Sequence, residues 1–147
     1  MTAGVKDPEA VMRLKAEPRL LATVRGAVRA YLACAGVEGD RLDDAVLAVD
    51  EACTNCIRHA YGGDPACSYS VELSTTGEAI VVAVKDEGAP CPEAALARHE
   101  LKPPAREAVE PGGLGIQLIY QAFDEVNYAS NGADGNCMEM RLRRTPD

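Results

Sequence analysis

Apolar residues near the start of the chain repeat with helical spacing behind one short strand-like segment. Residues 11–15 are typical of an edge strand, and Pro18 fits the first turn of a helix. The apolar positions that follow at helical spacing are Leu20, Leu21, Val24, Ala27, Val28, Tyr31 and Leu32. Gly36 and Gly39 close this predicted helix.

A second helix is predicted over residues 41–60, with Asp40 as its N-cap and Gly62-Gly63 at its end. At ~100° per residue, one set of its apolar side chains falls within an arc of about 100°. This set is Leu42, Ala45, Val46, Val49, Cys53, Cys56 and Ala60. We expect this stripe to face the core.

The middle of the chain changes to the period of strands. Residues 69–73 alternate apolar and polar side chains, and residues 79–84 form a β-branched apolar run. Thr76-Gly77 between them predicts a hairpin turn. Beyond Asp86, prolines and glycines crowd the chain, which indicates a functional loop rather than a packing element.

The last part of the chain predicts one helix and two strands joined by a hairpin. These elements are a helix over 114–123 and strands near 126–129 and 136–142, with turn signals at Asn131-Gly132 and Asp134-Gly135. The whole order is strand, helix, helix, strand, strand, loop, helix, strand, strand. It predicts an α/β fold, a two-layer sandwich of a mixed β-sheet covered on one face by helices.

The composition fits one domain spanning residues 1–147, with residues 1–8 as a loose leader. A count of 15 Lys and Arg against 23 Asp and Glu gives a net charge of −8. This charge argues against nucleic acid as the main partner, because phosphate neutralisation needs clustered basic residues. The longest apolar run, residues 79–84, is far shorter than the roughly 18 residues of a membrane span. Residues 1–9 lack a signal-peptide pattern, so we expect a cytoplasmic protein that does not bind membranes.

Six cysteines are expected to be reduced thiols in that compartment. They are Cys34, Cys53, Cys56, Cys67, Cys91 and Cys137. Cys53 and Cys56 have the spacing of half a metal or redox motif, but no second pair follows at zinc-ligand spacing. We therefore interpret both as helix-packing residues.

Three polar residues gather on the second helix, away from its apolar stripe. Glu51, Asn55 and Arg58 lie within about 60° of each other. A solvated polar face would explain them. Alternatively, the Glu51 carboxylate and the Asn55 carbonyl oxygen together could hold a hydrated hard cation such as Mg²⁺.

Two glycine-containing segments could also contact a ligand. Asp86 ends a strand two residues before Gly88, which fits either an ordinary turn or a hydrogen-bond acceptor beside a close backbone approach. Gly113 and Gly115 stand at a helix start, where free N–H groups and the helix dipole favour a phosphate. A flexible helix cap explains these glycines equally well.

The order and spacing of these signals resemble the N, G1 and G2 boxes of the GHKL (Bergerat-fold) ATPases. The matching segments are Glu-x-x-x-Asn at 51–55, Asp-x-Gly-x-Pro at 86–90 and Gly-x-Gly at 113–115. The flanking residues, 50–61 and 112–126, are similar to those of the small anti-sigma-factor serine/threonine kinases. The resemblance covers about residues 10–143.

That resemblance implies a Bergerat sandwich that binds ATP and Mg²⁺. It makes Glu51 the general base for the attacking hydroxyl or water, Asn55 the Mg²⁺ ligand and Arg58 a phosphate contact. An exposed charge explains Arg58 equally well. Asp86 would accept a hydrogen bond from the adenine amino group. The other implied nucleotide contacts are Gly88, Gly113, Leu114 and Gly115, with an ATP lid at residues 91–111.

One position departs from the family pattern. Some members carry a basic residue immediately before the G2 glycines, where this chain has Pro111 preceded by Glu110. The nearest cations of the lid are Arg106 and Lys102. The departure concerns the efficiency of phosphoryl transfer more than nucleotide binding.

The resemblance implies an ATP-dependent anti-sigma regulatory factor, a serine/threonine protein kinase. Such a kinase would phosphorylate a STAS-type antagonist and bind a sigma factor or equivalent regulator; a homodimer stays open. The alternative is a non-catalytic ATP/ADP-binding partner switch. A sensor-kinase catalytic domain acting on a histidine or aspartate elsewhere is disfavoured by the short chain. Glu51 favours catalysis, because a pure binder has no use for a base.

Overall fold

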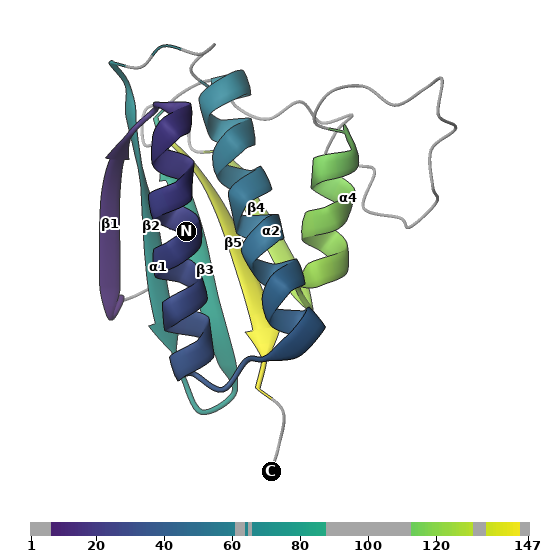
Figure 1. Cartoon of the computed structure of the whole chain (residues 1–147). Coiled ribbons are helices and arrows are strands. Elements are labelled where there is room, and N and C mark those ends of the chain that lie inside the picture. The colour runs from purple at the N-terminus through teal and green to yellow at the C-terminus, as the bar shows by residue number, and fades with distance from the viewer. Residues whose placement is uncertain (1–6, 61–63, 65, 88–112, 131–134, 145–147) are drawn as a thin grey trace.

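A five-stranded sheet carries its helices on one face in the computed structural model (Figure 1). The structure describes residues 7–60, 64, 66–87, 113–130 and 135–144. The elements are β1 (Ala10–Lys15), a 3₁₀ turn (Pro18–Leu20), α1 (Leu21–Cys34), α2 (Gly39–Asn55), a π-helical turn η2 (Cys56–Ala60), β2 (Ser68–Thr75), β3 (Ala79–Asp86), α4 (Gly113–Ala122), β4 (Glu125–Ser130) and β5 (Asn136–Arg143). The predicted two-layer α/β sandwich is confirmed.

The strand order is β1-β2-β3-β5-β4, and every neighbouring pair is antiparallel. The sheet was expected to be mixed, and the reason it is not lies in its last hairpin. β3 and β4 run in the same direction, but β5 lies between them and pairs with both. β1 is an edge strand, as predicted.

The second helix differs from its prediction at both ends. It begins at Gly39, so Asp40 lies in its first turn and the N-cap position belongs to Glu38. An acidic residue in the first turn still interacts favourably with the helix dipole. Regular α-helix ends at Asn55, and residues 56–60 continue as a wider π-helical turn. Such turns are rare and occur often at functional sites.

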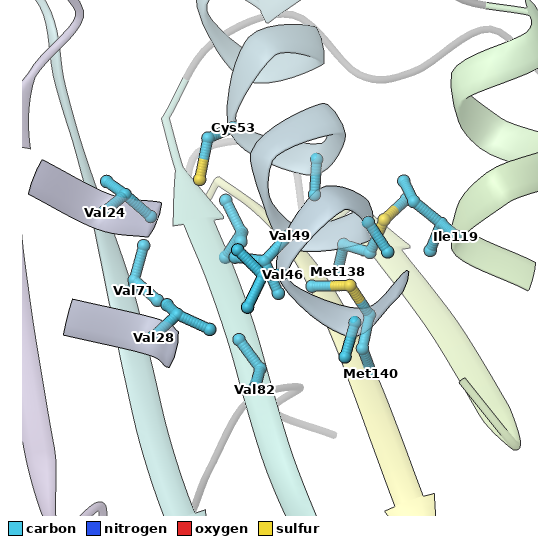
Figure 2. Close-up of a cluster of buried hydrophobic side chains, with 14 of the residues drawn as sticks. Val24, Val28, Val46, Val49, Cys53, Val71, Val82, Ile119, Met138 and Met140 are labelled. Atoms are coloured by element: carbon cyan, nitrogen blue, oxygen red, sulfur yellow. The ribbon is translucent and has the colours of Figure 1, made fainter. Parts of the chain in front are cut away.

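The core lies between α2 and the sheet, and it confirms most of the predicted apolar stripe. Figure 2 shows Val46, Val49 and Cys53 of α2 above Val82 of β3 and Met140 of β5. These side chains are buried. Burying a valine or methionine side chain stabilises a fold by about 1.5–3 kcal/mol. The middle of α2 is therefore anchored firmly to the sheet.

The interpretation of Cys53 and Cys56 as helix-packing residues is confirmed. Cys53 and Cys56 are free, buried thiols that pack in the core. Burial raises the pKa of both thiols. The carboxylate of Asp50 raises the pKa of Cys53 further, and the carboxylate of Asp86 raises that of Cys56. Cys91 lies outside the described residues.

Candidate functional site

The predicted site residues come together at one end of the sandwich. Figure 1 shows that α2 and β3 finish at the same end at which α4 and β5 begin. The strand register confirms this placement, because Asp86 at the end of β3 pairs with Asn136 at the start of β5. Asn55, Asp86 and Gly113, distant in sequence, therefore lie at the same end of the fold.

Packing on both sides of α2 determines where Asn55 lies. On one side, Asp50 of α2 forms a 2.9 Å ion pair with Arg25 of α1. At ~100° per residue, Ala48, Ala52 and Asn55 lie on the other side of the helix, where α4 lies beside α2 (Figure 1). Both alanines are buried. Asn55 is therefore directed toward the start of α4.

The side-chain amide of Asn55 is buried without compensation. Neither Oδ1 nor Nδ2 is accessible, and neither has a hydrogen-bond partner among the described residues. Leaving a buried polar group unsatisfied costs about 1–3 kcal/mol. Asn55 is therefore not part of a solvated polar face. Of the other two residues predicted with it, Arg58 is exposed and Glu51 is half-buried. The Asn55 oxygen is a suitable ligand for a hard cation.

A metal at this position would draw most of its ligands from elsewhere. Among the described residues, no group of three or more His, Cys, Asp or Glu side chains could hold an ion. Mg²⁺ in nucleotide sites typically keeps waters and substrate phosphates and takes only one or two protein oxygens. Asn55 therefore fits Mg²⁺ that arrives with a nucleotide better than a resident structural metal.

Asp86 is half-buried and held by neighbours from both layers of the fold. The side-chain amide of Asn136 donates a 2.7 Å hydrogen bond to Asp86 Oδ1. From the helix layer, the thiol of Cys56 hydrogen-bonds to the same carboxylate. Burial, followed by the charge of Asp86, raises the pKa of Cys56, so the thiol remains a donor at neutral pH. Sequence reasoning identified Asp86 but missed both partners.

Gly135 fits tightly against the backbone of Asp86. A Cβ atom on Gly135 would lie 2.2 Å from the Asp86 carbonyl oxygen, and the glycine has a φ of +87°. Both features exclude a larger residue. The sequence signal was the Asp134-Gly135 dipeptide, which predicted only a hairpin turn. The glycine also lets β5 approach the end of β3.

The G2 glycines begin α4 as predicted. Gly113, Leu114 and Gly115 are its first three residues. The first N–H groups of a helix have no intrahelical acceptor and carry the positive end of the dipole, which suits a phosphate. Gly88, Pro111 and the predicted lid at 91–111 lie outside the described residues. None of the described helices is long and apolar enough to cross a membrane.

A two-layer sandwich with Asn55, Asp86 and the α4 glycines at one end is the arrangement expected of an ATP-binding domain. Residues 14–142 match the family described as the histidine kinase-like ATPase domain. The chain therefore belongs to the histidine kinase-like (GHKL) ATPases, within their branch of anti-sigma-factor serine kinases.

The relatives that place it in that branch align over most of their length. The chain is 31% identical to the serine-protein kinase RsbW of Bacillus velezensis, over 82% of this chain and 77% of the relative. It is 29% identical to RsbW of Bacillus subtilis, over 78% and 74%. It is 28% identical to the anti-sigma F factor of Anoxybacillus flavithermus, over 79% of each.

Two solved structures share the fold at low sequence identity. A chain of the SiaB–SiaC complex from Pseudomonas aeruginosa superimposes with a TM-score of 0.67 at 16% identity, over 92% of this chain and 89% of that one. A Mycobacterium tuberculosis protein with RsbU and RsbW domains gives a TM-score of 0.63 at 20% identity, over 94% of this chain. This chain spans only 33% of that longer protein. At these identities the likeness concerns the fold alone.

Proposed function

We propose that this protein is an ATP·Mg²⁺-dependent kinase that transfers the γ-phosphoryl group to a serine of a STAS-type antagonist protein. It would also bind a sigma factor or an equivalent regulator, and it would act in the cytoplasm. The observation that carries the nucleotide site is the buried Asn55 amide, which has no partner among the described residues and lies at the same end of the fold as Asp86. Relatives named serine-protein kinase and anti-sigma F factor support a serine substrate and a sigma-factor partner. The STAS type of the antagonist follows from the family resemblance.

Each residue of the site has a distinct task in this proposal. Asp86 accepts a hydrogen bond from the adenine amino group, and Gly88 lets the base approach. The N–H groups of Gly113, Leu114 and Gly115 bind phosphate oxygens. Mg²⁺, when bound through Asn55, neutralises phosphate charge. Arg58, exposed near the same helix end, adds a phosphate contact.

Glu51 is the general base in this proposal. The serine Oγ attacks the γ-phosphorus, the bond to the β,γ-bridging oxygen breaks, and ADP leaves with that electron pair. The serine proton passes to the Glu51 carboxylate. Phosphoryl transfer depends mainly on positioning and charge stabilisation. A general base typically adds about 10²–10⁴-fold to the rate.

Glu51→Gln is the variant that tests this assignment. Glutamine keeps the size of the side chain but cannot take the proton, so ATP should bind normally while serine phosphorylation falls about 10²–10⁴-fold. The measurement is transfer of ³²P from γ-labelled ATP to a STAS-type protein of the same organism, with ATP affinity measured in parallel. Equal transfer by wild type and variant would favour a nucleotide-dependent partner switch without catalysis.

The same relatives leave both a monomer and a homodimer open for this chain. Sedimentation of the protein with and without ATP would decide between monomer and dimer.

A further inference from the structure

The carboxylate of Asp86 is held in place before any ligand arrives. Asn136, only 4% exposed, is the first residue of β5 and the register partner of Asp86. Its amide donates to Oδ1 at 2.7 Å. Hydrogen bonds to an ionised acceptor are roughly twice as strong as neutral ones. The contact therefore fixes the rotation of a terminal group whose torsion is otherwise broad.

We propose that Asn136 is a positioning residue for base recognition, which orients Asp86 toward the adenine amino group while Cys56 holds the same carboxylate from the helix layer. This inference rests on the proposed nucleotide site. An acceptor that is already oriented loses less rotational freedom when the base binds, so more of its hydrogen-bond energy contributes to affinity. A carboxylate offers about four lone-pair positions, which several donors can share.

Cys56 connects the residue proposed to recognise the base, Asp86, with the residue proposed to bind Mg²⁺, Asn55. It follows Asn55 directly and begins the π-helical turn η2. Its hydrogen bond to Asp86 joins the helix end that carries Asn55 to the strand end that would meet the base. The sequence interpreted Cys56 only as a packing residue. The contact gives this buried thiol a second task.

The test compares two nucleotides on the same protein. Purine riboside triphosphate lacks the 6-amino group but is otherwise like ATP, so the ratio of the two dissociation constants reports recognition of that group. Wild type should prefer ATP about 10–100-fold, the value of one charged hydrogen bond. Because both constants come from one sample, a fraction of unfolded protein cancels in the ratio.

Two pairs of variants isolate the donors. Asn136→Ala should reduce the ATP preference about tenfold, while Asn136→Ser, which keeps a shorter donor, should retain part of it. Cys56→Ala should reduce the preference by a smaller factor, and Cys56→Ser should restore it. Asn127→Ala on β4 and Cys53→Ala one turn earlier in α2 are the matched controls and should keep the wild-type ratio.

The outcomes separate this inference from the function on which it rests. If Asp86→Ala keeps the ratio, Asp86 does not recognise the amino group and the proposed base site is wrong. If Asp86→Ala abolishes the ratio but Asn136→Ala keeps it, the base site stands and the positioning role of Asn136 is refuted. A loss of affinity for both nucleotides in equal proportion would likewise show a purely structural asparagine. An unchanged ratio in Cys56→Ala would remove Cys56 from the arrangement.

Discussion

The middle and the last turn of α2 differ in how their buried groups are satisfied. In the middle, Val46, Val49 and Cys53 pack against apolar side chains of the sheet (Figure 2). At the end, Asn55 buries an amide that has no partner among the described residues. Within ten residues, the same helix thus combines well-packed apolar side chains with a buried amide whose desolvation is not compensated by a hydrogen bond among the described residues. Local departures of this kind are expected at functional sites rather than in cores.

The largest effect should follow from breaking the anchored region. Met140 of β5 is fully buried beneath the middle of α2. Met140→Ala removes its packing contacts and should lower the free energy of unfolding by about 2–5 kcal/mol. Urea denaturation measures this loss. ATP affinity, corrected for the folded fraction, should stay at the wild-type value, and a specific loss of affinity would show that the two regions are not separable.

High pH should weaken the same anchored region to an intermediate extent. Burial, and secondarily Asp50, raises the pKa of Cys53 above its ordinary value of 9.0 in the folded protein. Above about pH 9 the unfolded chain therefore releases a thiol proton that the folded chain retains, so stability falls as pH rises. Below pH 9 this contribution is fully present.

The measurement is the unfolding free energy of wild type and Cys53→Ala between pH 7 and pH 10.5. The variant lacks this thiol, so its stability should decline less steeply above pH 9. Parallel curves for the two proteins would mean that Cys53 titrates in the folded state as it does when exposed.

The smallest effect on stability is expected at the exposed part of the helix end. Arg58 is exposed in the π-helical turn. Arg58→Ala should change the free energy of unfolding by less than about 0.5 kcal/mol, as is usual for surface positions. Chemical denaturation checks this value. A salt-sensitive fall in ATP affinity in the same variant would support the proposed phosphate contact, and unchanged affinity would favour a plain surface charge.

The sequence was sufficient for the fold because the fold depends on periodic apolar positions. The stripe over Ala45, Val46, Val49 and Cys53 predicted which side of α2 meets the sheet, and all four residues are buried. The turn at Thr76-Gly77 was likewise predicted, since hairpin chemistry is local.

The contacts within the site were less predictable because they depend on distant packing. Asn55 looks exposed on an isolated helix, and its amide proves to be buried only in the packed fold, in which α4 lies beside α2. The hydrogen bond from Asn136 to Asp86 requires the β3–β5 register, across 50 residues of sequence. The box motifs identified Asp86 and Asn55, whereas their surroundings required the structure.

Asn55→Ala tests most directly whether the uncompensated helix end serves a ligand. Without nucleotide, this variant should be as stable as wild type or more stable, because it removes a buried unsatisfied amide worth about 1–3 kcal/mol. With ATP and Mg²⁺ at about 100 times the wild-type dissociation constant, wild type should gain about 2.7 kcal/mol and the variant much less. A variant that is clearly destabilised without nucleotide, yet gains as much as wild type from ATP and Mg²⁺, would contradict the account.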